Sequence, residues 1–139
     1  MDIDGTHRFN ASPQKVWSAL HDAALLQGCI PGAQQITWQG DSAIRVTAGI
    51  SIGPVNQTAT VNVQVTEQQP PTHIRLEGKS PHVSTSATVD LAPDGTGTLL
   101  RYNAQADIGG PLAAAAVLVK PFVESQLRQV FACLDSKIV

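Results

Sequence analysis

The sequence predicts an α+β fold in which a curved antiparallel sheet of about seven strands holds a long C-terminal helix. Two observations predict it. Between residues 36 and 108, apolar and polar residues alternate in runs that end at turn residues, which is typical of strands with one buried face. From Gly110 to Val139, apolar residues recur every three or four positions, which is the period of one helical face. A helix of this length would run for roughly 40 Å, so it must lie across a large apolar surface.

The N-terminal part predicts one strand and two short helices. Residues 3–10 form the strand, although its two faces are less clearly distinguished than those of later strands. Ser12-Pro13 is a helix start, with a serine cap followed by proline at the first helical position. Asp22 is a candidate cap for a second short helix, which Gly28 ends. A tight connector, Cys29-Ile30-Pro31-Gly32, leads into the sheet.

The remaining strands follow one another through short turns. The clearest runs from Val55 to Thr66 and alternates strictly between apolar and polar residues. The other expected strands lie at residues 36–38, 44–51, 73–79, 83–91 and 100–108.

Pro121 lies inside the predicted C-terminal helix and removes one backbone donor. Either the helix bends near Val117, or a first segment ends by Lys120 and the main helix begins at Pro121. A bend has two interpretations: the helix follows a curved sheet, or residues 109–120 form a mobile lid.

Length and composition limit the class of protein. With 139 residues, a single domain spanning residues 1–139 is expected. The net charge of −2 arises from scattered acids and bases, which argues against nucleic-acid binding. No apolar run approaches the ~20 residues of a membrane span, and the polar N-terminus predicts no secretory signal. Cys29 and Cys133 are predicted to be reduced, which favours a cytoplasmic protein.

Small residues occupy the expected inward rows of the sheet near the middle of the strands. The helix begins with four alanines at residues 113–116. Either the two layers approach closely, or a ligand occupies the space between them, because empty volume costs about 24 cal/mol per Å³. The second alternative predicts one cavity lined by Val46, Ala48, Ala59, Val61, Ala87, Tyr102, Ala104, Ala116, Val119 and Val123.

Catalytic and metal-binding patterns are missing from the sequence. The four histidines lack metal-ligand spacing, and Cys29 has no evident base that would make it a nucleophile. The inward polar candidates are Gln57, Thr85 and Tyr102, and none is paired with a base. We therefore predict no catalytic residue, no metal and no cofactor.

Several motifs, in order along nearly the whole chain, resemble the CoxG family of carbon monoxide dehydrogenase subunits, which belongs to the SRPBCC, START-like superfamily. They are Pro13-x-x-x-Val16-Trp17-x-x-Leu20-x-Asp22, Cys29-Ile30-Pro31-Gly32, Ile52-Gly53-Pro54-Val55, Pro70-Pro71, Gly95-Thr96-Gly97-Thr98-x-Leu100-x-Tyr102 and Gly109-Gly110-Pro111-Leu112-Ala113. The Cys-Ile-Pro-Gly and Gly-Pro-Val pieces are the most specific.

This resemblance implies a helix-grip fold with an apolar tunnel that binds a lipid or quinone. It also implies an accessory role for a molybdenum hydroxylase of the carbon monoxide dehydrogenase type, in membrane recruitment or electron transfer to quinone. Family members usually carry a longer glycine-rich stretch with a phenylalanine where this sequence has residues 78–83. Many also extend toward a membrane-binding tail, whereas this sequence ends at Val139, so only transient contact with the inner face of the membrane is expected.

Two functions from different classes are compatible with these patterns. The favoured one is a non-catalytic carrier of a hydrophobic molecule, and the alternative is a START-like enzyme such as a polyketide cyclase or aromatase. A carrier needs an entrance to its tunnel, and the sequence offers two glycine-containing candidates with apolar residues at the rim. The predicted gate residues are Ile30, Gly109, Gly110 and Leu112.

Overall fold

The computed structural model describes residues 2–30, 32–40, 42–52, 55–81, 83–110, 113 and 116–138. The predicted order of one strand, two short helices, six strands and a long helix is confirmed. The elements are β1 (Asp2–Phe9), α1 (Pro13–Leu20), α2 (Ala23–Cys29), β2 (Ala33–Gln39), β3 (Ala43–Ile52), β4 (Val55–Gln69), β5 (His73–Lys79), β6 (Val83–Asp94), β7 (Gly97–Ile108) and α3 (Ala116–Lys137).

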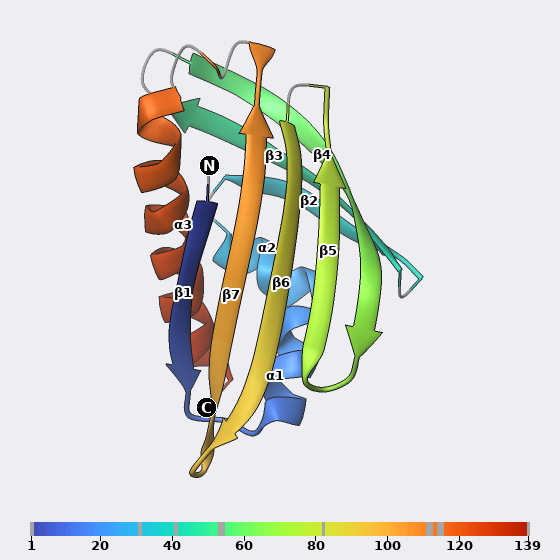
Figure 1. Cartoon of the computed structure of the whole chain (residues 1–139), viewed down its shortest axis with the longest axis vertical. Helices are drawn as coiled ribbons and strands as arrows, with labels where there is room; N and C mark the ends of the chain where they lie inside the picture. The colour runs from blue at the N-terminus through green and yellow to red at the C-terminus, as the bar shows by residue number, and fades with distance from the viewer. Residues whose placement is uncertain are drawn as a thin grey trace.

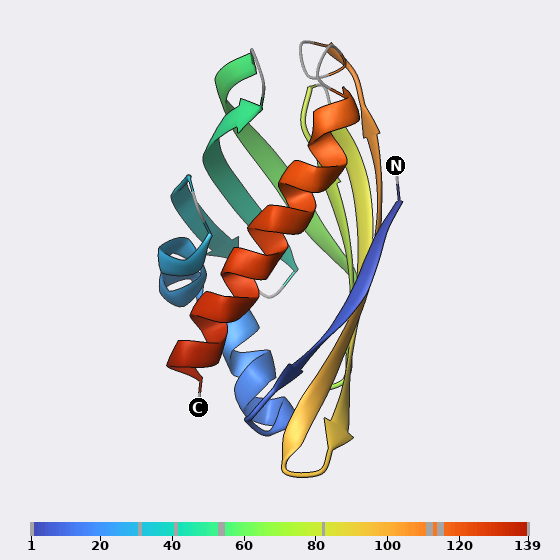
Figure 2. The same cartoon turned by 90° about the vertical axis from the view of Figure 1, so that its left-hand side faces the viewer.

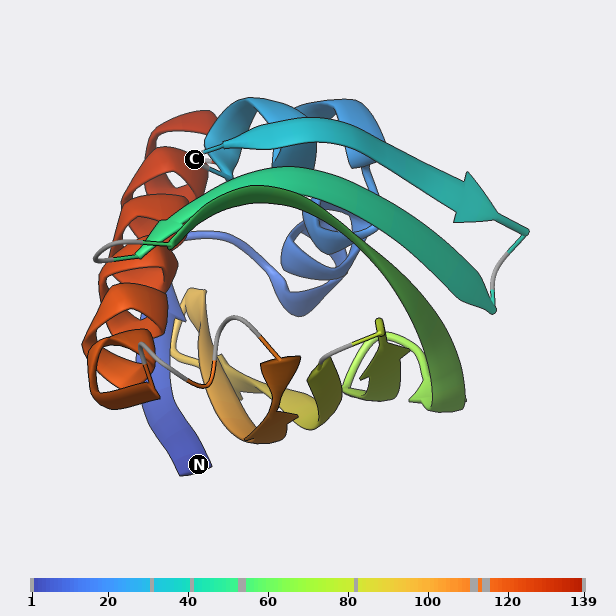
Figure 3. The ribbon, with the colours of Figure 1, turned by 90° about the horizontal axis from the view of Figure 1, so that it is seen from above.

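The seven strands form one antiparallel sheet in the order β1-β7-β6-β5-β4-β3-β2 (Figure 1). Strands β2 to β7 are consecutive neighbours, and β1 returns to pair with β7. Seen from above, the sheet curls strongly, and β2 and β3 arch over toward α3 (Figure 3). Figure 2 shows α3 crossing the open side of this curved sheet at an angle to the strands. The helix contacts both β1 and β3, so it bridges the two ends of the curl.

Both predicted caps of the short helices are present. The backbone N–H of Lys15 donates to Ser12 Oγ at 3.3 Å, and Pro13 occupies the first helical position. The N–H of Leu25 donates to Asp22 Oδ1 at 3.1 Å at the start of α2. These side chains bind donors that the first turn of a helix leaves without intrahelical partners.

The prediction of two reduced cysteines is wrong. Cys29, the last residue of α2, forms a disulfide with Cys133 of α3, and their Cα atoms lie 5.5 Å apart. The two residues are separated by 104 positions in the sequence, and only the packing of α2 against α3 brings them together. The disulfide removes the support that reduced cysteines gave to a cytoplasmic location, because disulfides persist mainly in oxidising compartments.

Helix α3 continues through Pro121, so the alternative in which the main helix begins at Pro121 is wrong. The helix starts at Ala116, six positions after the predicted start at Gly110. Gly110 itself has a φ of 61°, in the left-handed region that glycine adopts without strain. In the described part of the chain, no helix is long and apolar enough to span a bilayer.

The main hydrophobic core lies at one end of the molecule, where α1 and the C-terminal part of α3 meet the sheet. Its fully buried members are Phe9, Val16, Leu100 and Leu134, and Trp17 packs beside them. The buried Thr98 hydroxyl donates to the carbonyl oxygen of Ala11 at 2.7 Å, which satisfies this polar group. A second, smaller cluster surrounds Val119 near the other end of α3.

Candidate functional site

The concave face of the sheet brings most of the predicted cavity residues into two neighbouring groups. In one group, Val46 pairs with Val61 and Ala48 pairs with Ala59 across β3 and β4. In the other group, Ala87 pairs with Ala104 and Val89 pairs with Tyr102 across β6 and β7. Strand β5 lies between the groups, with Leu76 opposite Ala87. Directly paired residues point to the same face of a sheet, so the predicted rows are confirmed as one surface.

Helix α3 covers this surface unevenly. Val119 is buried against Val83 and Ile108 at one end of the sheet, and Val123 packs in the same cluster. At the opposite end, Val89 and Tyr102 pack against the cluster that contains Leu134. The helix residues Val119 and Val123 therefore face the sheet as predicted. The side chain of the remaining predicted helix residue, Ala116, lies outside the described residues.

Exposure differs sharply along the concave face. At the core end of β6 and β7, Leu91 and Leu100 are only 3% and 2% exposed. In the middle of the face, small and β-branched side chains stay partly exposed although they point toward the inside of the curl. These residues are Val46, Ala48, Ala59, Val61, Ala87 and Ala104. Apolar side chains thus remain accessible on the inner surface, which is the property that a site for an apolar ligand needs.

Tyr102 is a polar group at the border between this surface and β1. A Cβ atom added to Gly5 would lie 2.5 Å from Tyr102 Oη, so the glycine leaves room for the phenol. Burial raises the pKa of Tyr102, and the negative charges of Glu124 and Asp4 raise it further against the opposing effect of Arg128. The phenol therefore stays neutral near pH 7 and is able to donate a hydrogen bond.

A small pocket of about 220 Å³ lies beside Tyr102, between β1 and α3. His7 Nε2 lies 3.0 Å from both carboxylate oxygens of Asp135, and the His7 ring stacks on Phe131 at 4.8 Å. These contacts join β1 to α3 and hold the helix against one edge of the sheet. We assign them a structural role, because they are explained by this attachment alone.

The predicted gate residues separate into two places. Gly109 and Gly110 line a groove of about 450 Å³ together with Pro81, Val83 and Ile108, where β7 leaves the sheet toward α3. The connector at Ile30 lies instead between α2 and β2, and a hydrogen bond of 2.9 Å from Gly49 N to Gly32 O ties it to β3. Leu112 lies outside the described residues. Opening at either place stays a prediction.

Exposed apolar residues near this groove were not predicted from the sequence. Val117 is 86% exposed and Leu118 is 43% exposed, and both lie in the first turn of α3. Single exposed apolar residues are normal, but two adjacent ones at a helix start form a small apolar surface. The signal in the sequence is that both positions fall between the members of the apolar stripe at Ala116 and Val119.

An aromatic stack that the sequence does not predict joins α1 to β2. The ring of His21 lies between two indoles, with centroid distances of 4.7 Å to Trp17 and 4.9 Å to Trp38. Both rings are nearly parallel to the imidazole, at 28° and 16°. Trp17 also packs against the main core, whereas Trp38 extends the stack onto the sheet.

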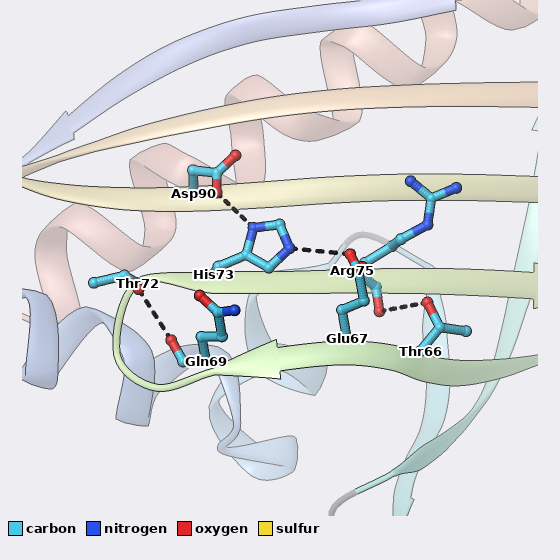
Figure 4. Close-up of polar contacts among 7 residues, drawn as sticks. All are labelled: Thr66, Glu67, Gln69, Thr72, His73, Arg75 and Asp90. Carbon is cyan, nitrogen blue, oxygen red and sulfur yellow. Dashed lines mark hydrogen bonds and ion pairs between the residues drawn. The ribbon is translucent and has the colours of Figure 1, made fainter.

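A polar cluster lies on the opposite, convex face of the sheet (Figure 4). His73 Nδ1 lies 2.6 Å from Asp90 Oδ1, and Nε2 lies 3.3 Å from Glu67 Oε2. Hydrogen bonds to Asp90 and Glu67 raise the pKa of His73 above 6.5, because both carboxylates favour the imidazolium. The cluster is solvent-exposed and separated from the concave face by the sheet.

We expect the Asp90→Asn variant to lower the pKa of His73, as followed by NMR titration of its ring protons. A raised pKa in the folded state means that these pairs stabilise the fold fully below about pH 6.5 and lose this effect as pH rises through the folded value. A His73 pKa that is equal in the variant and the wild type would show that the pairs do not form in solution.

The described residues contain no group of three or more histidine, cysteine or acidic side chains placed to hold a metal ion. Of the inward polar candidates, Thr85 donates its hydroxyl to the backbone oxygen of Gln105 at 2.9 Å. The side chain of Gln57 lies outside the described residues. What the described concave face offers is therefore apolar contact and a neutral phenol.

Comparison with solved structures identifies the fold. A conserved protein from Geobacillus kaustophilus superposes with a TM-score of 0.87 at 24% identity, covering 99% of this chain and 95% of that one. A START superfamily protein from Mycobacterium smegmatis gives a TM-score of 0.78 at 16% identity, covering 99% and 96%. A protein from Chromobacterium violaceum gives 0.72 at 19% identity, covering 96% and 97%. The fold is thus the START-like helix-grip fold that the sequence predicts.

Comparison of the sequence with family models gives the family. No curated protein matches the chain. The model for CoxG, described as a carbon monoxide dehydrogenase subunit, matches residues 5–139, which includes every strand and helix from within β1 onward. This match extends over nearly all of the chain and agrees with the motifs found along it. The chain therefore belongs to the CoxG family of carbon monoxide dehydrogenase subunits.

Proposed function

We propose that this protein binds a hydrophobic small molecule, a lipid or quinone, between the concave face of the sheet and α3. The observation that carries the proposal is the exposure gradient along β6 and β7. Leu91 and Leu100 are buried, whereas Ala87 and Ala104 on the same face and the same strands are partly exposed. A ligand in the middle of the face would remove this apolar surface from water, at about 25 cal/mol per Å² buried.

A binding role is better supported than catalysis. A START-like cyclase would need an acid or base near its reacting chain, held within hydrogen-bond reach. The polar groups described on the concave face are a threonine that already donates to backbone and a tyrosine whose pKa is raised. The one described pair of histidine and carboxylate near this end, His7 with Asp135, joins β1 to α3.

The family name supports an accessory role for a carbon monoxide dehydrogenase-type molybdenum hydroxylase. We propose that the protein carries its ligand between such an enzyme and a membrane, in a single domain spanning residues 1–139. Action at the inner face of the membrane remains part of the proposal.

The binding proposal is tested by displacement of an apolar fluorescent dye. The protein is first loaded with 1-anilinonaphthalene-8-sulfonate and then titrated with decylubiquinone or a short-chain phospholipid. Saturable displacement by at least one of these ligands is expected. Failure of the dye and of both ligands to bind to folded protein would contradict the proposal.

The first turn of α3 provides a candidate contact for transient membrane binding. We expect the double variant Val117→Ser, Leu118→Ser to slow ligand transfer to vesicles several-fold, because interfacial binding scales with the apolar area that enters the bilayer. Stability should change by less than about 0.5 kcal/mol per site, since both side chains are exposed. Transfer is measured with decylubiquinone and phosphatidylcholine–phosphatidylglycerol vesicles.

Ala92→Ser is the control variant for this measurement, since Ala92 is exposed on β6 at the far end of the molecule from the α3 start. It should transfer ligand at the wild-type rate. Equal rates for the double variant, the control and the wild type would exclude the α3 start as the membrane contact.

A further inference from the structure

We infer that the indole N–H of Trp38 donates a hydrogen bond to a neutral carbonyl oxygen of the ligand. The inference rests on the proposed function and narrows it. The ligand would be a hydrophobic molecule with a carbonyl group, either a quinone ring or an acyl ester, rather than a plain hydrocarbon.

The position of Trp38 places it on the ligand side of the sheet. Trp38 lies in β2, opposite Ile44 of β3, and Ile44 lies opposite Val63 of β4. Two residues along, Ile36 lies opposite Val46, which belongs to the predicted cavity surface. Side chains two residues apart on a strand point to the same face, so the indole and that surface share one side of the sheet.

The indole ring and its N–H group have different surroundings. The ring stacks on His21, an interaction that a phenylalanine would also provide. The Nε1 atom, in contrast, is fully buried and has no hydrogen-bond partner among the described residues. A buried donor without a partner costs about 1–3 kcal/mol, and native structures contain few of them. The tryptophan thus carries a polar group that the stack does not need.

The neighbouring histidine does not provide an acceptor for this donor. His21 Nδ1 lies 2.8 Å from the carbonyl oxygen of Trp17, and Nε2 lies 3.1 Å from Gln68 Oε1. Both ring nitrogens are therefore engaged, and the imidazole turns its face rather than an edge toward Trp38.

A donor that is already removed from water discriminates strongly between ligands. Its desolvation cost is present in the unliganded protein, so an arriving carbonyl gains a hydrogen bond without that cost on the protein side. A hydrocarbon gains nothing from the donor. An ionised carboxylate would lose its hydration in an apolar environment, which favours a neutral acceptor.

The test compares a carbonyl ligand with a hydrocarbon of similar shape. Affinities for decylubiquinone, dioctanoylglycerol and decylbenzene are measured for the wild type and for Trp38→Phe. We expect the variant to lose roughly five- to tenfold in affinity for at least one carbonyl ligand, and to bind decylbenzene as the wild type does. Which carbonyl ligand loses affinity identifies the quinone or the ester as the source.

Trp17→Phe is the matched control, because Trp17 stacks on the other face of the same histidine. It should change the affinities for all three ligands by the same factor. A second readout needs no variant of the stack: in ¹⁵N-labelled wild type, the Trp38 indole N–H resonance should move downfield when the carbonyl ligand binds and stay in place with decylbenzene.

Equal loss for all three ligands in Trp38→Phe, or an indole resonance that responds alike to carbonyl ligand and hydrocarbon, would overturn the inference while leaving the binding proposal intact. If none of the three ligands binds to the wild type, the binding proposal itself fails and the inference falls with it.

Discussion

The Ala87→Phe variant is expected to lose hydrophobic-ligand binding by at least about tenfold while remaining folded. Ala87 lies in the middle of the concave face, opposite Ala104 and next to Leu76, and its side chain is partly exposed. A phenyl ring at this position would occupy the volume that the ligand needs. Because the site is not closely packed, the larger side chain should be accommodated without the usual cost of overpacking.

Stability distinguishes the two alternatives for the space between sheet and helix. If the layers were closely packed at Ala87, the added ring would cost about 1–3 kcal/mol of unfolding free energy. Ala92→Phe is the matched control, since Ala92 is an exposed alanine on the same strand and lies on the opposite face. Dye displacement and thermal unfolding are measured for both variants. Loss of stability in Ala87→Phe without loss of binding would contradict the predicted site.

Removal of the disulfide with Cys29→Ser and Cys133→Ser is expected to lower the free energy of unfolding by about 4–5 kcal/mol. The bond joins residues 104 positions apart, and closing so long a loop restricts the unfolded chain strongly. Cys29 also belongs to the main core together with Leu134, so the loss of the bond affects the joint between α2 and α3. Denaturant unfolding of the oxidised protein and of the double variant measures the difference.

A thiol reductant provides the control for this measurement. Dithiothreitol should lower the stability of the wild type to that of the double variant, and it should leave the double variant unchanged. Equal stability of the wild type and the double variant in oxidising buffer would show that the disulfide does not form. The bond also fixes the end of α2 beside Ile30, so its removal is a direct way to free the second predicted gate.

Local patterns in the sequence were sufficient to predict most of the architecture. Strict alternation in Val55–Thr66 predicts which side chains point inward, because the period of a strand admits two faces. Ser12 and Asp22 mark the two helix starts because their side chains bind the first free N–H groups. For the same reason of strand period, the predicted cavity residues on the strands do share one face of the sheet.

Features that depend on long-range packing were not predictable in the same way. The Cys29–Cys133 bond, the stack of Trp17, His21 and Trp38, and the exposure of Val117 all follow from how α1, α2 and α3 dock on the sheet. The period of an element indicates the face that it buries, but it does not indicate which distant residue lies opposite. The four alanines and Pro121 likewise left the start of the last helix undecided.

Native mass spectrometry tests the central claim most directly. The protein is purified without detergent, its intact mass is recorded under native conditions, and the same material is extracted with organic solvent. We predict a bound species that is lost on denaturation and recovered in the extract as a quinone or lipid, and that is reduced in Ala87→Phe but not in Ala92→Phe. Ligand-free wild-type protein that also takes up no added decylubiquinone or phospholipid would contradict the claim that this fold carries a hydrophobic molecule.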